Sequence, residues 1–307
     1  MRRATAALDY QETINFSFVE EAWELDLAGN ADPIRLLNPI ASQMSVMRSS
    51  LIGSLLQVVK FNADRKAERV RVFELGRVFR RDASVPGSDS TVEGFDQPMR
   101  VAGMAWGPEQ PLGWQGKARM VDFYDVKGDV QALLAPSQPE FVAAEHPALH
   151  PGRSAQVVLD GVVIGHVGEL HPRWRQQWDL PSAPVVFELA LDAVLARHVP
   201  QAQAVPKHQP VERDIAVIVR ESVGHAQLMQ TIHAAPTDGL LQSAVLFDIY
   251  RPKPDAVGSA LNAGEKSLAV RLTLGHPESS LTDAQIDAAV QAVVAHLAHS
   301  LDARLRG

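Results

Sequence analysis

The chain has 307 residues, no cysteine and a formal net charge of −7, from 29 Lys and Arg against 36 Asp and Glu. The lack of cysteine excludes disulfides, zinc–thiolate sites, iron–sulfur clusters and thiol nucleophiles, and the acidic balance argues against non-specific binding to nucleic acid or acidic membranes. The length suggests about two domains; because no apolar run reaches membrane-spanning length and no hydrophobic signal core follows Arg3, we expect a cytoplasmic protein with no membrane contact.

The first part of the chain mixes helical and strand patterns. Apolar spacing predicts helices over residues 1–10, 20–27, 48–62, 124–134 and 171–178. Alternating apolar residues predict strands over residues 14–19, 34–37, 70–79, 100–106, 155–159, 162–167 and 185–189. Asp160 and Gly161 predict a tight hairpin between two of these strands, and residues 82–97 indicate an exposed loop. Since strands outnumber helices without strict interleaving, we expect an α+β antiparallel sheet rather than a doubly wound fold.

A linker divides the chain. Residues 200–210 hold three prolines, three glutamines and no aromatic residue, a composition typical of an extended connection between domains. We therefore expect one domain over residues 1–199 and a second over residues 206–307. The second domain is not basic, with 9 Lys and Arg against 11 Asp and Glu. Any contact with RNA must accordingly be local and directed by shape.

The second domain has a regular order of elements. The sequence predicts strands over residues 213–219, 245–251 and 264–272, a helix over residues 225–235, a second helix capped by Thr282, and a short last strand over residues 303–306. The order βαββαβ is the split-βαβ plan of ferredoxin-like domains. This plan leaves one face of the sheet under helices and the other face open to a ligand.

Four blocks in this domain carry a family resemblance: residues 213–214 (RD), 247–250 (FDIY), 264–268 (GEKSL) and 281–283 (LTD). In this order and spacing, each on its predicted element, they resemble the ferredoxin-fold anticodon-binding domain that closes the β subunits of bacterial phenylalanine–tRNA ligases. The resemblance implies that the open face of the sheet meets the anticodon loop of a tRNA.

The first domain resembles the same family through five more blocks, residues 38–51, 73–79, 122–129, 146–153 and 165–172. They resemble the catalytic-like module of the β subunit, a copy of the class II synthetase fold. The resemblance implies a C-terminal fragment that scaffolds the catalytic α subunit, in an α2β2 tetramer, and places tRNA for aminoacylation. The family's preceding domains have no counterpart here, and the helix at Met1 begins without a cap, which we read as a truncated start.

The resemblance assigns RNA contacts to three residues of the second domain. Tyr250 would stack under a base, Asp248 would accept hydrogen bonds from the edge of a guanine, and Ser267 would add a polar contact. An aromatic ring offers about 1–3 kcal/mol per stacked base, and an aspartate rejects adenine because adenine lacks the two donors. The alternative is that Tyr250 packs against Pro252 and Asp248 caps a turn.

Four further residues complete the predicted RNA-binding set: Lys266, Arg251, Arg213 and His208. His208 stands where the family usually carries an aromatic residue beside a basic one, so its ring would stack less strongly than Phe or Tyr. Arg213 has an alternative role as well, because it could form an internal salt bridge with Asp214 at the start of a strand.

Two clusters raise the possibility of a metal. His146, His150 and His171 lie near Glu169, but Pro147 and Pro151 break the helix that a His-x3-His site requires, so these histidines are expected to shape turns. The other cluster has helical spacing and could bind Mg²⁺, although an acidic first helical turn is the commoner meaning; its members are Asp122, Asp125 and Asp129. We expect no metal site and no cofactor in this chain.

The chain lacks the signature of an adenylating site. The strand over residues 70–79 leads to Arg77, Arg80 and Arg81 without an Arg-x-Glu pattern, and no Gly-x-Gly-x-Gly occurs. No P-loop, serine elbow or dinucleotide fingerprint replaces it. The chain is therefore expected to be non-catalytic, with ATP and Mg²⁺ implied only for the whole enzyme. The alternatives are a free-standing RNA-binding module and a cryptic metal-dependent enzyme using the acidic and histidine residues near 122–171.

The face formed by residues 14–60 is expected to be a protein interface. In the family, the corresponding helix and its neighbours bury against the α subunit. Without that partner, an apolar patch over Phe16, Phe18 and Leu51 should be exposed or covered by a second copy of the chain.

Overall fold

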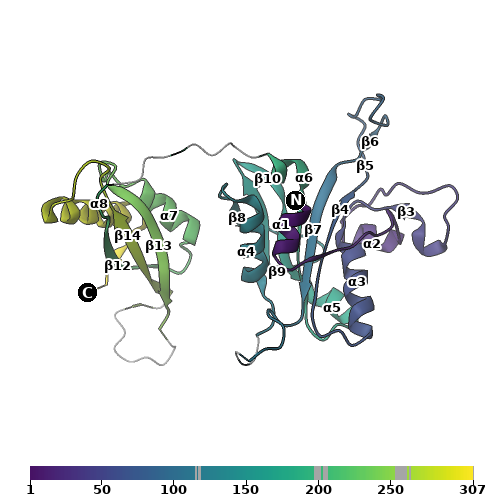
Figure 1. Cartoon of the computed structure of the whole chain (residues 1–307), viewed down its shortest axis with the longest axis horizontal. Coiled ribbons are helices and arrows are strands. Elements are labelled where there is room, and N and C mark those ends of the chain that lie inside the picture. The colour runs from purple at the N-terminus through teal and green to yellow at the C-terminus, as the bar shows by residue number, and fades with distance from the viewer. Residues whose placement is uncertain are drawn as a thin grey trace. The chain divides into compact units, whose positions relative to one another are not determined.

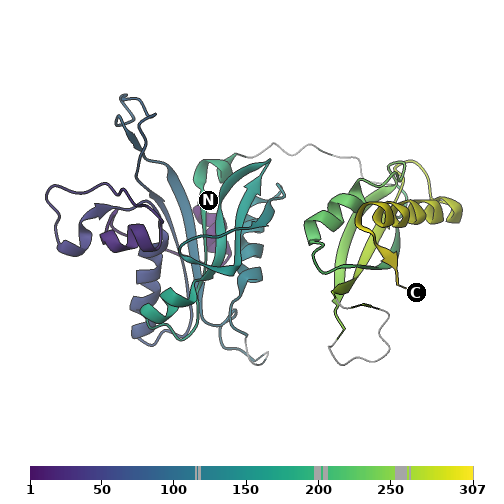
Figure 2. The same ribbon diagram turned by 180° about the vertical axis from the view of Figure 1, so that it is seen from behind.

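The chain forms two compact units, Met1–Val199 and Pro200–Gly307. The computed structural model describes residues 1–114, 116, 119–196, 202, 207–252, 261–262 and 264–306 (Figures 1 and 2). Most of the predicted linker over residues 200–210 lies outside the described residues. Within the described part of the chain, no helix is long and apolar enough to cross a membrane.

A seven-stranded sheet is the centre of the first unit. Its spatial order is β1-β4-β7-β11-β10-β9-β8, and every neighbouring pair is antiparallel except β1 with β4. The predicted α+β antiparallel sheet is thus confirmed, with one parallel edge strand. The bounds are β1 Gln11–Glu12, β4 Val70–Arg77, β7 Met99–Trp106, β8 Glu140–Ala143, β9 Leu149–Leu159, β10 Val162–Leu170 and β11 Val185–Ala190.

Helices cover both faces of this sheet (Figure 1). One core lies under α1 (Arg2–Ala7), α4 (Phe123–Leu134) and α6 (Leu191–Leu195). The other lies under α2 (Glu21–Asp26), α3 (Ile52–Asp64) and α5 (Pro172–Gln177). Strand β7 contributes to both cores, because Val101 and Ala105 face α4 while Met104 faces α3. A strand covered on both faces is apolar at nearly every position, as β7 is.

Several predicted boundaries shift in the structure. Of the strand expected over residues 14–19, only β2 (Phe18–Val19) forms, and it pairs with β3 (Val46–Met47). The strand expected over residues 34–37 is wrong, since only Arg35 makes a bridge, to Val46. A short 3-10 helix, η1 (Ser42–Met44), precedes β3. Strand β8 and helix α6 were not predicted, and β5 (Arg80–Arg81) pairs with β6 (Phe95–Asp96) inside the expected loop.

The predicted hairpin between β9 and β10 is confirmed. Asp160 and Gly161 have φ values of 50° and 78°, the left-handed conformation that a two-residue type I′ turn requires at both positions. Gly161 adopts it without a steric penalty, and aspartate tolerates it better than most residues. The turn and a β-bulge between Val163 and Gly165 together set the register that brings His166 of β10 beside Gln156 of β9.

Helix α3 begins at Ile52 rather than at residue 48, because three carboxylates, two buried and one half-buried, hold the preceding segment, residues 48–51. Glu74 of β4 pairs with Arg48, Oε1 lying 2.7 Å from Nη2. Glu24 of α2 accepts a hydrogen bond of 2.9 Å from the backbone N–H of Ser49. The third carboxylate, Glu188 of β11, accepts from the hydroxyl of Ser50 at 2.5 Å and from the backbone N–H of residue 51 at 3.2 Å. One short segment thus joins a helix and two strands.

The second unit has the predicted βαββαβ order. Its sheet runs β13-β14-β12-β15 with antiparallel neighbours. Thr282 and Gln285 form the capping box that starts α8, which confirms the predicted N-cap. Side chains of α7 and α8 pack on one face of the sheet, in a core around Val217 and Val270. The bounds are β12 Val211–Arg220, α7 His225–His233, β13 Leu241–Tyr250, β14 Glu265–Leu274, α8 Asp283–Leu301 and β15 Arg304–Leu305.

The buried pair between Arg48 and Glu74 gives a stability prediction. Both side chains are at most 5% exposed, so Arg48→Met leaves a buried carboxylate without its cationic partner, although Asn15 still donates to its other oxygen. We expect the free energy of unfolding in urea to fall by about 3–5 kcal/mol. The matched control is Arg2→Met, which breaks the exposed pair with Glu12 and should cost less than about 1 kcal/mol. Equal losses in the two variants would contradict a special role for the buried pair.

Candidate nucleic-acid interface

Asp248 and Tyr250 lie on the face of the second sheet that faces away from α7 and α8. Leu246 packs into the core beneath these helices, and a β-bulge between Leu246 and Asp248 shifts the register by one residue. Asp248 therefore pairs with Ala269, and Tyr250 pairs with Ser267. A bulge re-aims the side chains that follow it. Here it sends Asp248 to the open face although Leu246, two residues earlier, points into the core.

Tyr250 has a cation beside its ring. The guanidinium carbon of Arg306 lies 4.8 Å from the ring centroid, within the range of a cation–π contact. The backbone N–H of Arg306 donates to Ala216 of β12, which fixes this end of the chain against the sheet. The tyrosine ring remains 39% exposed. Ser267 of β14 lies between strand β12 and Tyr250 of β13, and it is only 3% exposed.

A second aromatic residue and a second cation extend the same face. The guanidinium carbon of Arg271 lies 5.6 Å from the ring centroid of Phe247, the residue in the bulge. Arg271 also donates to both oxygens of Asp214, at 2.8 and 2.9 Å. These hydrogen bonds hold the pKa of Asp214 below its usual value. Within the described residues, Asp248 makes no hydrogen bond or ion pair, so its carboxylate is open to a ligand.

Two of the alternatives drawn from the sequence for this region do not match the structure. Asp214 pairs with Arg271 on the open face, so the expected salt bridge between Arg213 and Asp214 is wrong. Arg213 pairs in register with Leu272 on the other face, and its side chain donates to the carbonyl oxygen of Glu212. Asp248 lies within β13 and caps no turn.

The remaining predicted residues are not gathered around Tyr250. Lys266 is 8% exposed and pairs in register with Val219, so its side chain lies on the face of the sheet that the helices cover. It donates a hydrogen bond to the carbonyl oxygen of Glu221. Arg251 also pairs with Glu221, at 2.7 Å. His208 lies before the start of β12, at the other end of that strand, where its Nδ1 is 3.2 Å from the hydroxyl of Ser280.

Sequence reasoning missed Arg306, Arg271 and Phe247 as members of this face. The alternation of Arg304 and Arg306 in the last strand could have indicated two cations on one side of the sheet. Arg304 pairs with Glu265 at 2.5 Å, at the edge of the same face. The contact between Arg306 and Tyr250 joins residues 56 positions apart, which no local pattern reveals.

The histidines of the first unit shape turns, as the sequence predicted. Nδ1 of His146, His150 and His171 each accepts a hydrogen bond from the backbone N–H two residues later, at 2.9–3.2 Å. Glu169 pairs with Arg153 at 2.7 Å. Each Nδ1 is thus already an acceptor, and within the described residues no three His, Cys, Asp or Glu side chains are grouped to hold a metal ion.

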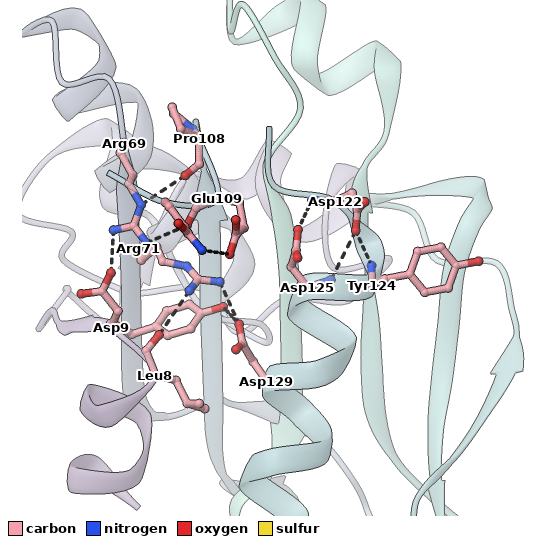
Figure 3. A network of polar contacts seen from close by, with 12 residues as sticks. Leu8, Asp9, Arg69, Arg71, Pro108, Glu109, Asp122, Tyr124, Asp125 and Asp129 are labelled. Atoms are coloured by element: carbon pink, nitrogen blue, oxygen red, sulfur yellow. Dashed lines mark hydrogen bonds and ion pairs between the residues drawn. The ribbon is translucent and has the colours of Figure 1, made fainter. Parts of the chain in front are cut away.

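The acidic cluster at α4 is structural too (Figure 3). Asp122 caps the helix, accepting from the backbone N–H groups of Tyr124 and Asp125. The carboxylate of Asp125 accepts a hydrogen bond from the backbone N–H of Asp122 and forms an ion pair with Arg119. One turn further, Asp129 accepts from the hydroxyl of Tyr10 at 2.8 Å and from Arg71 at 2.9 Å. Asp122 and Asp125 share Arg119, whereas Asp129 pairs with Arg71.

The expected protein interface of the first unit exposes some of its apolar side chains and buries others. Five large apolar residues of the first forty are strongly exposed: Ile14 at 93%, Phe16 at 64%, Leu25 at 62%, Leu37 at 98% and Ile40 at 77%. Leu51 is wrong as a surface residue, because it is fully buried in the core beside α3. Phe18 is half-buried.

The arginines that follow β4, where the sequence lacks an adenylating motif, contact other parts of the first unit. Arg77 donates to the carbonyl oxygen of Gln97 at 2.7 Å, and Arg80 to that of Ser49 at 3.3 Å. Arg81 lies 3.3 Å from a carboxylate oxygen of Asp32.

Family models match both units of the chain. Residues 1–191 match the model described as "Phenylalanyl tRNA synthetase beta chain CLM domain". Residues 206–306 match the "Ferredoxin-fold anticodon binding domain".

Curated relatives match along the whole chain. A protein named phenylalanine–tRNA ligase beta subunit from Ralstonia nicotianae is 54% identical, and one of the same name from Cupriavidus pinatubonensis is 51% identical. Each match covers 100% of this chain, which spans 38% of the length of either relative. Among solved structures, a pyrrolysyl tRNA synthetase from Desulfitobacterium hafniense matches with a TM-score of 0.45 and 11% identity, over 63% of this chain and 62% of that one. That likeness is too weak to support a conclusion.

Proposed function

This chain belongs to the phenylalanyl-tRNA synthetase beta chain family, and on that basis we propose that it is the C-terminal part of a β subunit that binds tRNA and scaffolds a catalytic partner. The second unit (residues 206–307) contacts the anticodon region of the tRNA. The first unit (residues 1–199) is a non-catalytic module with a class II synthetase-like fold. It pairs with an α subunit in an α2β2 enzyme that uses ATP and Mg²⁺ in the cytoplasm.

The observation that carries the proposal is the open face of the second sheet. It presents a tyrosine ring and an unpaired carboxylate together, on a domain whose family model is named for anticodon binding. Arg306 lies beside the ring of Tyr250, and the part of the ring left exposed can stack on an unpaired base. A preorganised ring loses little conformational freedom on binding, and stacking tolerates any base.

We assign the selection of the base to Asp248. A carboxylate accepts two hydrogen bonds, and the Watson–Crick edge of guanine supplies two adjacent N–H donors, whereas adenine supplies only one exocyclic amino group there. Asp248 follows the bulge on the same face as Tyr250, so one nucleotide could stack and pair at once. Ser267 is a weaker candidate for a polar contact, because it is buried in the free protein.

Phosphate contacts make a smaller contribution. Arg271, Arg251 and Arg304 are already paired with carboxylates, and the domain carries 9 Lys and Arg against 11 Asp and Glu. Few phosphates are therefore neutralised, which implies a shallow dependence of tRNA binding on salt concentration.

Loss of the Tyr250 ring tests the stacking role. Tyr250→Ala should weaken tRNA binding by about 1–3 kcal/mol, measured by fluorescence anisotropy with labelled tRNA. The matched control is Tyr124→Ala, which removes a tyrosine that is 75% exposed on the first unit and should leave the affinity unchanged. A folded Tyr250→Ala protein that binds tRNA as tightly as the wild type would refute this role.

Asp248→Asn tests base selection. The change keeps the size of the side chain but replaces one acceptor oxygen with a donor. It should reduce discrimination between guanine and adenine at the contacted position more than it reduces affinity for the tRNA body. The measurement compares two anticodon stem–loops that differ at one base, with Asp287→Asn on the solvent side of α8 as the control. Unchanged discrimination would remove Asp248 from the recognition site.

The exposed apolar residues of the first forty positions support the scaffolding role. Leu37 is almost wholly exposed, and burying a leucine contributes about 1.5–3 kcal/mol. Leu37→Ser should weaken association with the α subunit by about that amount in analytical ultracentrifugation. Leu112→Ser, at a similarly exposed leucine in another loop, is the control. If the α subunit and this chain do not associate at all, the alternative of a free-standing RNA-binding module gains support.

The chain alone should make no phenylalanyl-adenylate. Arg77 is held by a carbonyl oxygen and Arg81 by Asp32, so neither is free to bind ATP phosphates. ATP–pyrophosphate exchange with phenylalanine should stay at background and should appear when the α subunit is added. Exchange that persists in the isolated chain after host enzyme is removed would contradict the non-catalytic assignment.

A further inference from the structure

A polar cavity of about 160 Å³ lies in the first unit, beside the segment 48–51. Strands β7, β10 and β11 run side by side under it, and each contributes one ionisable residue, Arg100, His166 and Glu188. Arg80 of β5 and His146, from the turn before β9, line the same cavity. None of these residues has a part in the function proposed above.

Arg100 is the unusual member of the cluster. Its side chain is half-buried, yet within the described residues its guanidinium makes no hydrogen bond and no ion pair. Arg80 uses only Nη2, in a bond of 3.3 Å to the carbonyl oxygen of Ser49. Guanidinium groups that are removed from bulk water normally have acceptors, because each unmet donor costs free energy. The cavity therefore holds more donors than its own acceptors use.

The charges that line the cavity also favour an anionic ligand. Two guanidinium groups face a single carboxylate, Glu188, one of whose oxygens already accepts from Ser50 and from the backbone N–H of residue 51. Burial lowers the pKa of His146 to about 4 and also lowers the pKa of His166, so both rings are neutral at neutral pH. At least one positive charge is left without a counterpart.

The histidines add directed donors. The rings of His146 and His166 lie 4.9 Å apart, between centroids, and are tilted by 52°. Because Nδ1 of His146 accepts from the backbone N–H of Ala148, its proton lies on Nε2, which is free to donate. Within the described part of the chain, neither nitrogen of the His166 ring has a hydrogen-bond partner.

We propose that this cavity binds a small oxyanion, of the size of orthophosphate or acetate, held by the guanidinium groups of Arg100 and Arg80 and by the Nε2–H of His146. Planar guanidinium forks match the paired oxygens of carboxylates and phosphates. The volume exceeds that of several water molecules, which is enough for an anion of this size and too little for a nucleotide. The site is separate from the tRNA-binding face, so it goes beyond the function proposed above.

The test titrates the purified chain with orthophosphate and, separately, with acetate, following the imidazole signals of His146 and His166 by NMR. We expect saturable shifts of both rings, and the anion that saturates at the lower concentration identifies the chemical class. Failure of both anions to move these signals would overturn the proposal.

Arg100→Met is the decisive variant. Within the described residues it breaks no hydrogen bond or ion pair, so the chain should fold with at most a small change in its unfolding midpoint in the absence of anion. We expect its affinity for the preferred anion to fall by about tenfold or more, with partial recovery in Arg100→Lys. The control is Arg175→Met, at an exposed position of α5. If Arg100→Met binds as tightly as the wild type, or Arg175→Met loses as much, the site is not this cavity.

Discussion

The first unit depends on three carboxylates gathered around the segment 48–51, two of them buried and one half-buried. Glu24, Glu74 and Glu188 come from α2, β4 and β11, and each is satisfied by a side-chain or backbone donor of that segment. Removing carboxylates from water is costly, and only complete pairing offsets the cost. The segment is therefore fixed in one conformation, which sets where α3 begins and how it lies on the sheet. The donors left over at its border face the polar cavity beside Glu188.

The two faces of the sheet in the second unit have different roles. Apolar residues of β12 and β14 pack against α7 and α8, while the opposite side of the same strands carries small residues, arginines and the aromatic rings of β13. Arginine is the cation suited to this arrangement, because it can contact a ring and a carboxylate at once, as Arg271 does with Phe247 and Asp214. The face is therefore ordered before any ligand arrives, although the domain is acidic overall.

Much of this could be predicted from the sequence, and the exceptions share a cause. Strands β4, β7 and β11, helix α4 and the capping box at Thr282 follow from local periodicity and caps, which act over a few residues. The start of α3 could not be predicted, because distant carboxylates override a helical pattern. The neighbours of Tyr250 were missed for the same reason. The resemblance named Tyr250 and Asp248, but Arg306 reaches the ring only through the pairing of β15 with β12.

The bulge in β13 makes substitution and deletion unequal along that strand. Phe247 is the extra residue between Leu246, which faces the core, and Asp248, which faces outward. A chain without Phe247 would regain regular alternation and still present Asp248 and Tyr250 together, because neighbouring residues point to opposite faces. A chain without Ile249 would place those two residues on opposite faces. Over evolutionary time, β13 can therefore vary in length at the bulge but not between the two residues of the open face.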